Sequence, residues 1–275
     1  MATLFSFLFS MAILFSWNAH ARGLSAKRHT GESFQAAYNR VHAYNSILED
    51  ESSDDSMSAV RVPPAKRKKS LRRLNIQEIP ELDSVDDLEA EFQFVRDNRF
   101  LQTDDPTFPR RLTWLYPDDG CYARAEMASK KLIAQNFPKP KKIFVFGNLT
   151  AKTGNATSGS VNWWYHVAVT YRVGDTAYVL DPAINPQHPM KLTEWNQAVG
   201  GDQTSVKYAI CSNDTFDPDS DCLNPAVMSE AQAEAEQKGF LPDEWDRLLE
   251  LNRDPTKELG QFPPWLMDEI FQTLW

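Results

Sequence analysis

A strand–turn–strand pattern between residues 161 and 182 constrains the fold most, because it fixes which side chains share a face. Apolar and aromatic residues fill both arms, and Gly174-Asp175 provides the turn. A short apolar strand at 143–146 and a Gly/Thr/Ser/Asn-rich loop at 147–160 precede it. Helix-forming stretches lie at 85–94, 122–135, 228–238, 240–251 and 265–274. The mixture predicts an α+β fold.

Length and charge exclude several classes of protein. With 275 residues the chain can bury a full core, and eight Trp, eight Tyr and sixteen Phe argue against wholesale disorder. The net charge of −9 argues against a general nucleic-acid binder, because phosphate contacts need a basic face. No ligand spacing supports a zinc site, and no calcium-loop pattern is complete. We therefore expect no metal and no cofactor.

The first 21 residues have the pattern of a secretory signal peptide. An apolar run from Leu4 to Trp17 is followed by Ala19-His20-Ala21, a small-x-small cleavage pattern. The alternative is an N-terminal membrane anchor, but the run is shorter than the roughly 20 residues that span a bilayer. The sequence thus predicts a secreted or periplasmic protein that is free of the membrane after cleavage.

Residues 22–73 differ in composition from the rest of the chain. Acidic residues cluster at 49–55, and a basic run with Pro63-Pro64 covers 61–73. Such charge blocks are typical of a solvated linker, and they also suit a protease-sensitive joint after a pro-segment. We interpret 22–73 as a pro-segment with a charged linker, and 74–275 as a catalytic domain with a helical C-terminal tail at 228–275.

The three cysteines fall into two groups. Cys211 and Cys222 bracket a polar, turn-rich loop and are expected to form a disulfide, although two free thiols are the alternative. Cys121 follows the turn-forming Pro117-Asp-Asp-Gly and precedes the helical stretch 122–135. At the first turn of a helix the positive dipole end favours a thiolate, so Cys121 is a candidate nucleophile. The alternative is a buried structural cysteine.

A nucleophilic cysteine needs a base and an orienting group. His29 and His42 precede the expected catalytic domain, and His188 lies in an expected exposed turn, which leaves His166. The turn at Gly174-Asp175 sets Ala168 opposite Asp181, with His166 diagonal to Asp181 and within its reach. A slip of one residue would separate them, and a core histidine and a turn-capping aspartate are the alternatives. Strict alternation puts His166 with Trp164, Ala168 and Thr170, and Trp163, Tyr165, Val167, Val169 and Tyr171 on the other face.

Three motifs resemble the bacterial protein-glutaminase (protein-glutamine deamidase) family: Asp119–Ala125, Trp164–Ala168 and Leu180–Pro182. The resemblance covers about residues 75–225. It implies a papain/transglutaminase-like core, in which the nucleophile begins a helix packed on an antiparallel sheet, and a Cys121–His166–Asp181 triad. It also implies a secreted pro-enzyme. Glu126 departs from the family pattern, where a histidine is expected, and the tail 228–275 is not explained.

The resemblance implies a protein-glutamine deamidase that converts protein-bound glutamine to glutamate and ammonia through a cysteine thioester. Its partners would be proteins or peptides with accessible glutamine, and we expect a monomer. Trp163, Trp164 and Tyr165 are candidates for the substrate cleft, while Arg124 is expected on the helix surface or in a structural ion pair. The same triad also serves transglutaminases and cysteine peptidases. A non-enzymatic secreted binding protein with a buried, inert Cys121 is the remaining alternative.

Overall fold

The structure, a computed structural model, describes residues 61–103, 109–200 and 206–264. An antiparallel five-stranded sheet has the order β4-β3-β2-β1-β5. Its strands are β1 (Lys141–Lys152), β2 (Ser160–Val173), β3 (Thr176–Leu180), β4 (Met190–Lys191) and β5 (Lys207–Cys211). The helices are η1 (Pro64–Lys66), η2 (Leu71–Arg73), η3 (Ile76–Glu78), α2 (Val85–Asp97), α3 (Cys121–Ala134), α4 (Leu192–Ala198), α5 (Glu230–Lys238), α6 (Leu241–Glu250) and α7 (Pro255–Glu258). The predicted α+β class, with a helix beginning at the candidate nucleophile and packed on an antiparallel sheet, is confirmed.

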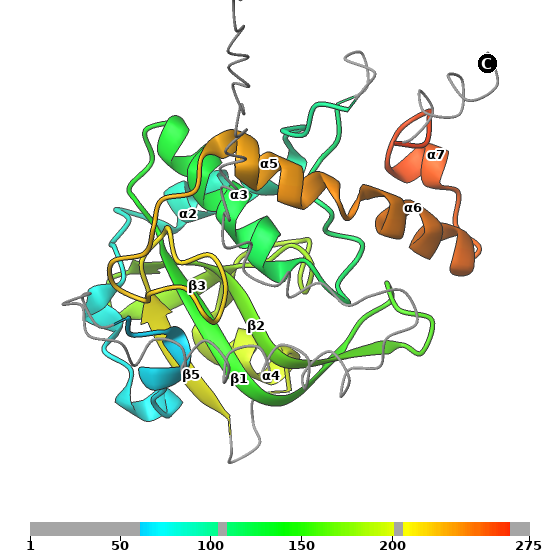
Figure 1. The fold of residues 1–275 in the computed structure, drawn as a ribbon. Coiled ribbons are helices and arrows are strands. Elements are labelled where there is room, and N and C mark those ends of the chain that lie inside the picture. The colour runs from blue at the N-terminus through cyan, green and yellow to red at the C-terminus, as the bar shows by residue number, and fades with distance from the viewer. Residues whose placement is uncertain (1–60, 104–108, 201–205, 265–275) are drawn as a thin grey trace, which may run out of the picture.

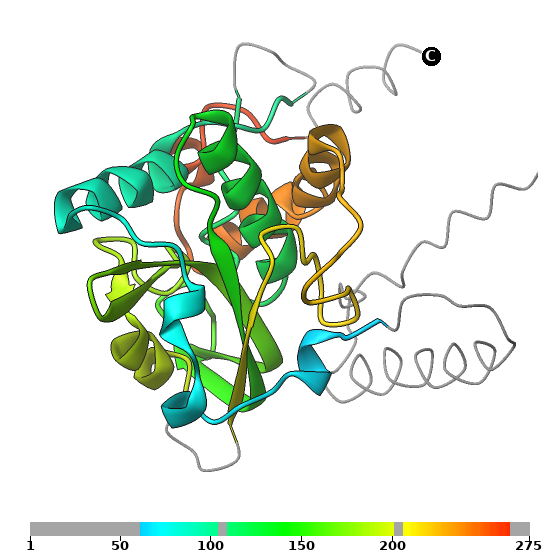
Figure 2. The ribbon, with the colours of Figure 1, turned by 90° about the vertical axis from the view of Figure 1, so that its left-hand side faces the viewer.

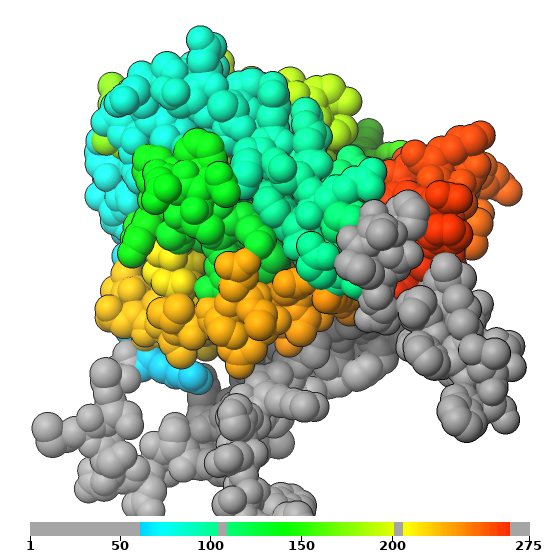
Figure 3. All heavy atoms as spheres, turned by 90° about the horizontal axis from the view of Figure 1, so that it is seen from above, coloured from blue at the N-terminus to red at the C-terminus, as the bar shows by residue number. Residues whose placement is uncertain are grey.

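Helices cover both faces of the sheet (Figure 1). The N-terminal half of α3 packs on Phe144 of β1 and Val167 of β2. On the opposite face, Trp195 of α4 packs among the alternate residues of the same strands, such as Val145. Seen from above, α3 lies between the α2 side of the molecule and α5 (Figure 3). The first residue of α3 is therefore supported by a sheet that is buried on both sides.

The hairpin register agrees with the prediction from the turn. Val169 pairs with Leu180 and Val173 pairs with Thr176, and Gly174 adopts the left-handed φ of 56° that this tight turn requires. Strand β1, however, runs on to Lys152, so the predicted loop at 147–160 is wrong for its first six residues. Alternating burial of Leu149 and Ala151 extends this strand beyond an irregularity in the register after Phe146.

Residues 61–73 lie along the outer edge of the sheet rather than apart from it (Figure 2). Lys69 and Tyr208 of β5 exchange both backbone hydrogen bonds, at 2.8 Å each, and Cys222 N donates to the carbonyl of Val62. The basic run thus covers the exposed backbone of an edge strand, which needs such protection. The predicted signal peptide at 1–21, the part of the pro-segment at 22–60 and the helix at 265–274 lie outside the described residues. Within the described ranges, no helix is long and apolar enough to cross a membrane.

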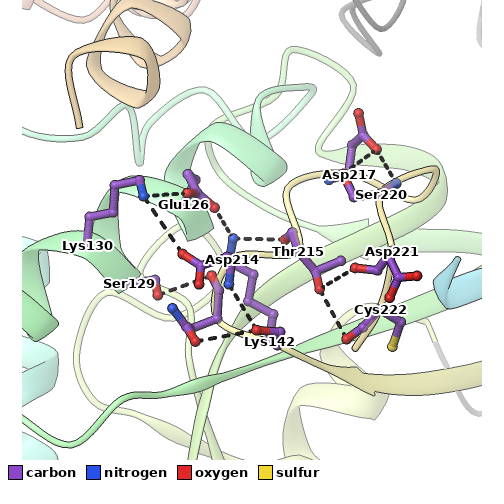
Figure 4. A network of polar contacts seen from close by, with 12 residues as sticks. Glu126, Ser129, Lys130, Lys142, Asp214, Thr215, Asp217, Ser220, Asp221 and Cys222 are labelled. Carbon is purple, nitrogen blue, oxygen red and sulfur yellow. Dashed lines mark hydrogen bonds and ion pairs between the residues drawn. The ribbon is translucent and has the colours of Figure 1, made fainter. Parts of the chain in front are cut away.

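A buried ion pair joins α3 to β1 and to the loop that follows β5 (Figure 4). Lys142 and Glu126 are fully buried and in direct contact, and Lys142 Nζ also donates to the carbonyl of Thr215 at 2.9 Å. Lys130 reaches the other carboxylate oxygen of Glu126 at 3.1 Å. Burial lowers the pKa of Lys142, and the charge of Glu126 opposes that effect. The predicted disulfide between Cys211 and Cys222 is confirmed and closes the same loop.

Removing Lys142 alone is expected to be more harmful than removing the whole pair. Lys142→Met leaves the Glu126 carboxylate buried without its main partner, which costs about 3–5 kcal/mol of unfolding free energy. The double variant Lys142→Met/Glu126→Leu is expected to recover part of that loss, because no uncompensated charge remains buried. Lys131→Met, which breaks an ion pair with the exposed Glu230, should change stability by less than about 1 kcal/mol. Denaturant unfolding at pH 7 measures all three, and a double variant no more stable than Lys142→Met would contradict the expectation.

Candidate active site

Cys121 is the first residue of α3, and the chain reaches it through a left-handed glycine. Gly120 has φ 77°, and a Cβ at this position would meet the ring of Phe240 at 3.0 Å. Only glycine combines this conformation with so little space. Cys121 is 7% exposed and is not in a disulfide, whereas Cys211 and Cys222 are paired. The predicted position at a helix start therefore agrees with the structure.

Arg124, one turn into α3, holds the loop that leads to Cys121. Its buried guanidinium donates through Nη1 to the carbonyls of Thr113, Tyr116 and Asp119, at 3.2, 2.9 and 2.8 Å. The sequence led us to expect Arg124 on the helix surface or in an ion pair, but it is buried and forms no side-chain ion pair with the described residues. Arg124 instead caps backbone carbonyls that a turn would otherwise bury without partners.

His166 and Asp181 meet across the β2–β3 hairpin, as the register predicts. His166 Nε2 lies 2.7 Å from Asp181 Oδ2, and both side chains are buried. His166 Nδ1 has no hydrogen-bond partner among the described residues, and Cys121 is close enough to act on the imidazole. Because Asp181 accepts the Nε2 proton, the neutral ring carries its lone pair on Nδ1.

Electrostatics at the pair favour a protonated imidazole beside an ionised carboxylate. Burial alone lowers the pKa of His166, but the charge and hydrogen bond of Asp181, together with the interaction with Cys121, outweigh it and raise this pKa to about 9. Burial raises the pKa of Asp181, yet His166, the indole of Trp195 and the charge of Arg124 hold it below its ordinary value. At neutral pH His166 is therefore protonated and Asp181 is ionised.

Trp195 is a site residue that sequence reasoning missed. Its Nε1 donates to Asp181 Oδ2 at 2.8 Å, and its ring lies 5.8 Å from that of His166. It comes from α4, a seven-residue helix that was not predicted. A lone tryptophan in a short helix carries no sequence signal that links it to an aspartate at the end of another element.

Trp163 and Trp164 do not lie on the faces that strict alternation predicted, whereas Tyr165 packs with Val167 as predicted. Trp163 stacks on His166, with ring centroids 4.4 Å apart and planes 10° apart, so these two residues lie on one side. The register irregularity opposite Trp164 breaks the period of two at this point. Trp163 also donates from Nε1 to the carbonyl of Pro117 at 3.0 Å. This hydrogen bond connects β2, which carries His166, to the loop that precedes Cys121.

Of these three aromatic residues, Trp163 and Tyr165 are buried and Trp164 is partly exposed, packed against Tyr165 at 4.4 Å between centroids. Trp164 is therefore the one most accessible to a ligand, and a role in the cleft stays a prediction. Across residues 61–103, 109–200 and 206–264, no group of three His, Cys, Asp or Glu side chains is arranged to hold a metal ion.

Comparison with known proteins finds a family model and solved structures that are similar to part of this chain. Residues 88–199 match a protein-family model described as glutaminase. No curated protein sequence matches the chain. Among solved structures, a crystal structure of protein-glutaminase is 23% identical and covers 58% of this chain and 88% of its own, with a TM-score of 0.46. The NMR structure of protein-glutaminase from Chryseobacterium proteolyticum is 26% identical, with 59% and 88% covered and a TM-score of 0.45.

A crystal structure of pro-protein-glutaminase is 20% identical and covers 81% of this chain and 68% of its own, with a TM-score of 0.42. The segment matched by the family model contains Cys121, His166 and Asp181, and the sequence resemblance to this family is confirmed. Residues 88–199, which make up less than half of the chain, are similar to the glutaminase family.

Proposed function

We propose that this protein is a secreted protein-glutamine deamidase, which hydrolyses the side-chain amide of protein-bound glutamine to glutamate and ammonia. The observation that supports it most is the His166–Asp181 contact beside Cys121, within the segment that matches the glutaminase family. Cys121 is the nucleophile, His166 the base and acid, and Asp181 the group that orients the imidazole. Protein or peptide substrates with accessible glutamine follow from the same assignment.

The reaction divides into two half-reactions. Cys121 Sγ attacks the glutamine Cδ while His166 holds the thiol proton, and the carbonyl oxygen becomes an oxyanion. Backbone N–H groups at the start of α3, that of Cys121 included, are the candidate donors to that oxyanion. His166 then protonates the departing nitrogen and the C–N bond breaks. Ammonia departs, and the glutamine side chain remains bound to Cys121 as a thioester. In the second half, His166 takes a proton from water, which attacks the thioester and releases glutamate and the thiol.

Asp181 acts on His166 and not on the substrate. Its Oδ2 accepts from Nε2, which fixes the ring orientation and stabilises the imidazolium that forms in each half-reaction. Trp195 holds the same oxygen from the other side, and Trp163 covers one face of the ring. The base is thereby locked in one rotamer, which lowers the entropy cost of reaching the transition state.

We further propose that the chain is made as a precursor with residues 1–21 as its signal peptide and 22–73 as its pro-segment. The apolar run and cleavage pattern support the former, and the change of composition supports the latter. The backbone contacts of Val62 and Lys69 with the domain suggest that part of the basic run stays attached after processing.

Ammonia release tests the reaction. The processed protein is expected to release ammonia from a denatured, glutamine-rich protein without shortening it, and Cys121→Ala should lose the activity because no nucleophile remains. Incorporation of a labelled amine with little hydrolysis would indicate a transglutaminase, and chain cleavage would indicate a peptidase. If Cys121 resists iodoacetamide in the folded protein and Cys121→Ala keeps every activity, the protein is a non-enzymatic binder.

The pH dependence tests the role of Asp181. His166 is expected to titrate at about 9 in the NMR spectrum, assigned by comparison with His166→Gln. Activity should persist below that pH and fall as pH rises through it, because the proton that His166 gives to ammonia is lost. In Asp181→Asn the His166 pKa is expected to fall toward its ordinary value of about 6.5, and the alkaline limb of kcat/KM should move with it. A parent His166 that already titrates near the ordinary value would contradict the assignment.

Limited proteolysis tests the precursor. Lys66 and Lys68 are exposed, so trypsin is expected to cut within 61–73 and to raise activity as the preceding segment leaves. N-terminal sequencing locates the cut, and ammonia release is measured before and after it. Equal activity in the two forms would exclude an inhibitory role for residues 22–73.

A further inference from the structure

The loop of residues 113–120 decides where the nucleophile lies, because it leads directly into Cys121 and consists of turns. Its inner side is held by the catalytic elements themselves. Arg124 of α3 binds three of its carbonyls, and Trp163 of β2 binds a fourth, that of Pro117. These contacts all lie within the segment that matches the glutaminase family.

The outer side of the same loop is held by helices beyond that segment. Gln237 of α5 donates to Thr113 Oγ1 at 2.7 Å, and the Leu115 N–H donates to Glu244 of α6 at 2.8 Å. Glu244 is buried, which raises its pKa to about 7 against the opposing effects of the Leu115 N–H and three arginines. The sequence resemblance does not account for these helices, yet they contact the nucleophile loop at several points.

Arg247 of α6 forms an ion pair with the loop of residues 113–120. Its guanidinium forms an ion pair with Asp118, three residues before Cys121, and lies 5.3 Å from the ring centroid of Tyr116. Arg247 and Asp118 are only 11% and 17% exposed, so water screens this pair weakly. The second partner of Arg247, Glu250, is 57% exposed and contributes little.

Arg247 also reaches the arm of the sheet that leads to the base. The same Nη1 that contacts Asp118 donates to the carbonyl of Asn155, in the connection between β1 and β2, at 2.8 Å. Arg253 binds the Asn155 side chain at 2.6 Å. Figure 1 shows α6 above the end of this arm, with α7 beyond it. One side chain thus joins the segment before Cys121 to the hairpin whose second strand carries His166.

We infer that Arg247 is a positioning residue of the active site, which holds the Cys121 loop through Asp118 and fixes it relative to the β1–β2 arm. The C-terminal helices would then contribute to the geometry of the active site and would not be only an addition to the domain. Because a displacement of the nucleophile by a fraction of an ångström changes reactivity strongly, loss of this bridge should act on the chemical step more than on substrate binding. The inference rests on the proposed role of Cys121 as nucleophile.

The test compares Arg247→Ala with Arg247→Lys and with Lys238→Ala in the full chain. Lys238 forms an ion pair with Glu234 on α5. Lys238→Ala therefore removes an ion pair from the C-terminal helices without changing a contact to the loop of residues 113–120. Arg247→Ala is expected to lower kcat for ammonia release about tenfold, with KM changed by no more than about twofold. Arg247→Lys should restore part of kcat, because its ammonium can still pair with Asp118 but lacks the separate guanidinium nitrogens that bind Asp118 and Asn155 through Nη1 and Glu250 through Nε. Lys238→Ala should behave like the parent.

A second readout does not depend on the substrate. The rate of alkylation of Cys121 by iodoacetamide is expected to fall by a similar factor in Arg247→Ala and to remain unchanged in Lys238→Ala. The other two cysteines form a disulfide and do not compete. If no variant or parent releases ammonia but the alkylation rates differ as stated, the proposed function fails while the positioning role stands. Equal alkylation rates and equal kcat in Arg247→Ala and the parent would overturn the inference.

A double-mutant cycle separates positioning from stability. If Arg247 acts through Asp118, adding Asp118→Ala to Arg247→Ala should cause little further loss of kcat or of alkylation rate. Strictly additive losses would overturn this route. Should Arg247→Ala fail to fold, as judged by thermal unfolding, Arg247→Lys with and without Asp118→Asn carries the same comparison. In that case, a kcat and an alkylation rate of Arg247→Lys equal to those of the parent would overturn the bridging role.

Discussion

The buried carboxylate of Asp181 is the charge around which the site is built. Removing a carboxylate from water costs several kcal/mol unless partners replace the lost hydration. Those partners come from three elements: His166 from β2, Trp195 from α4 and, at longer range, Arg124 from α3. Because α4 and the start of α3 pack on opposite faces of the sheet, this one carboxylate interacts with residues from both helical layers of the domain. The hairpin, the sheet and its covering helices are therefore all required to hold the imidazole.

Helix α3 is anchored by charge along its length as well as at its first residue. Arg124 binds the preceding loop, and Glu126 binds Lys142 in the interior beside the disulfide loop. Glu126 is the residue at which the resemblance led us to expect a histidine. Its carboxylate points to Lys142 of β1, which also binds the loop after β5, so Glu126 forms an internal ion pair apart from Cys121, His166 and Asp181. Anchored at two successive turns, α3 cannot slide along the sheet without leaving buried charges uncompensated.

The sequence predicted the parts of the site that depend on local rules. The turn at Gly174-Asp175 set the register of the hairpin, and the register brought His166 to Asp181. Prediction failed where the register of β1 and β2 is irregular: Gly147 and Asn148 separate Leu149 and Ala151 from the apolar run at 143–146, so the second half of β1 was not predicted. The same irregularity turned Trp163 onto the face of His166. Periodicity carries information only while each residue advances the strand by one pleat.

The remaining contacts were out of reach for a different reason. Trp195, Glu244 and Arg247 act on residues that are distant in sequence, and no periodicity or motif links such partners. Their importance follows from packing: the polar groups of a turn-rich loop need partners on both sides, and α3 and β2 supply them only on the inner side. In this chain α5 and α6 contact the outer side, so the loop before Cys121 is bound by residues that follow the segment matched by the family model.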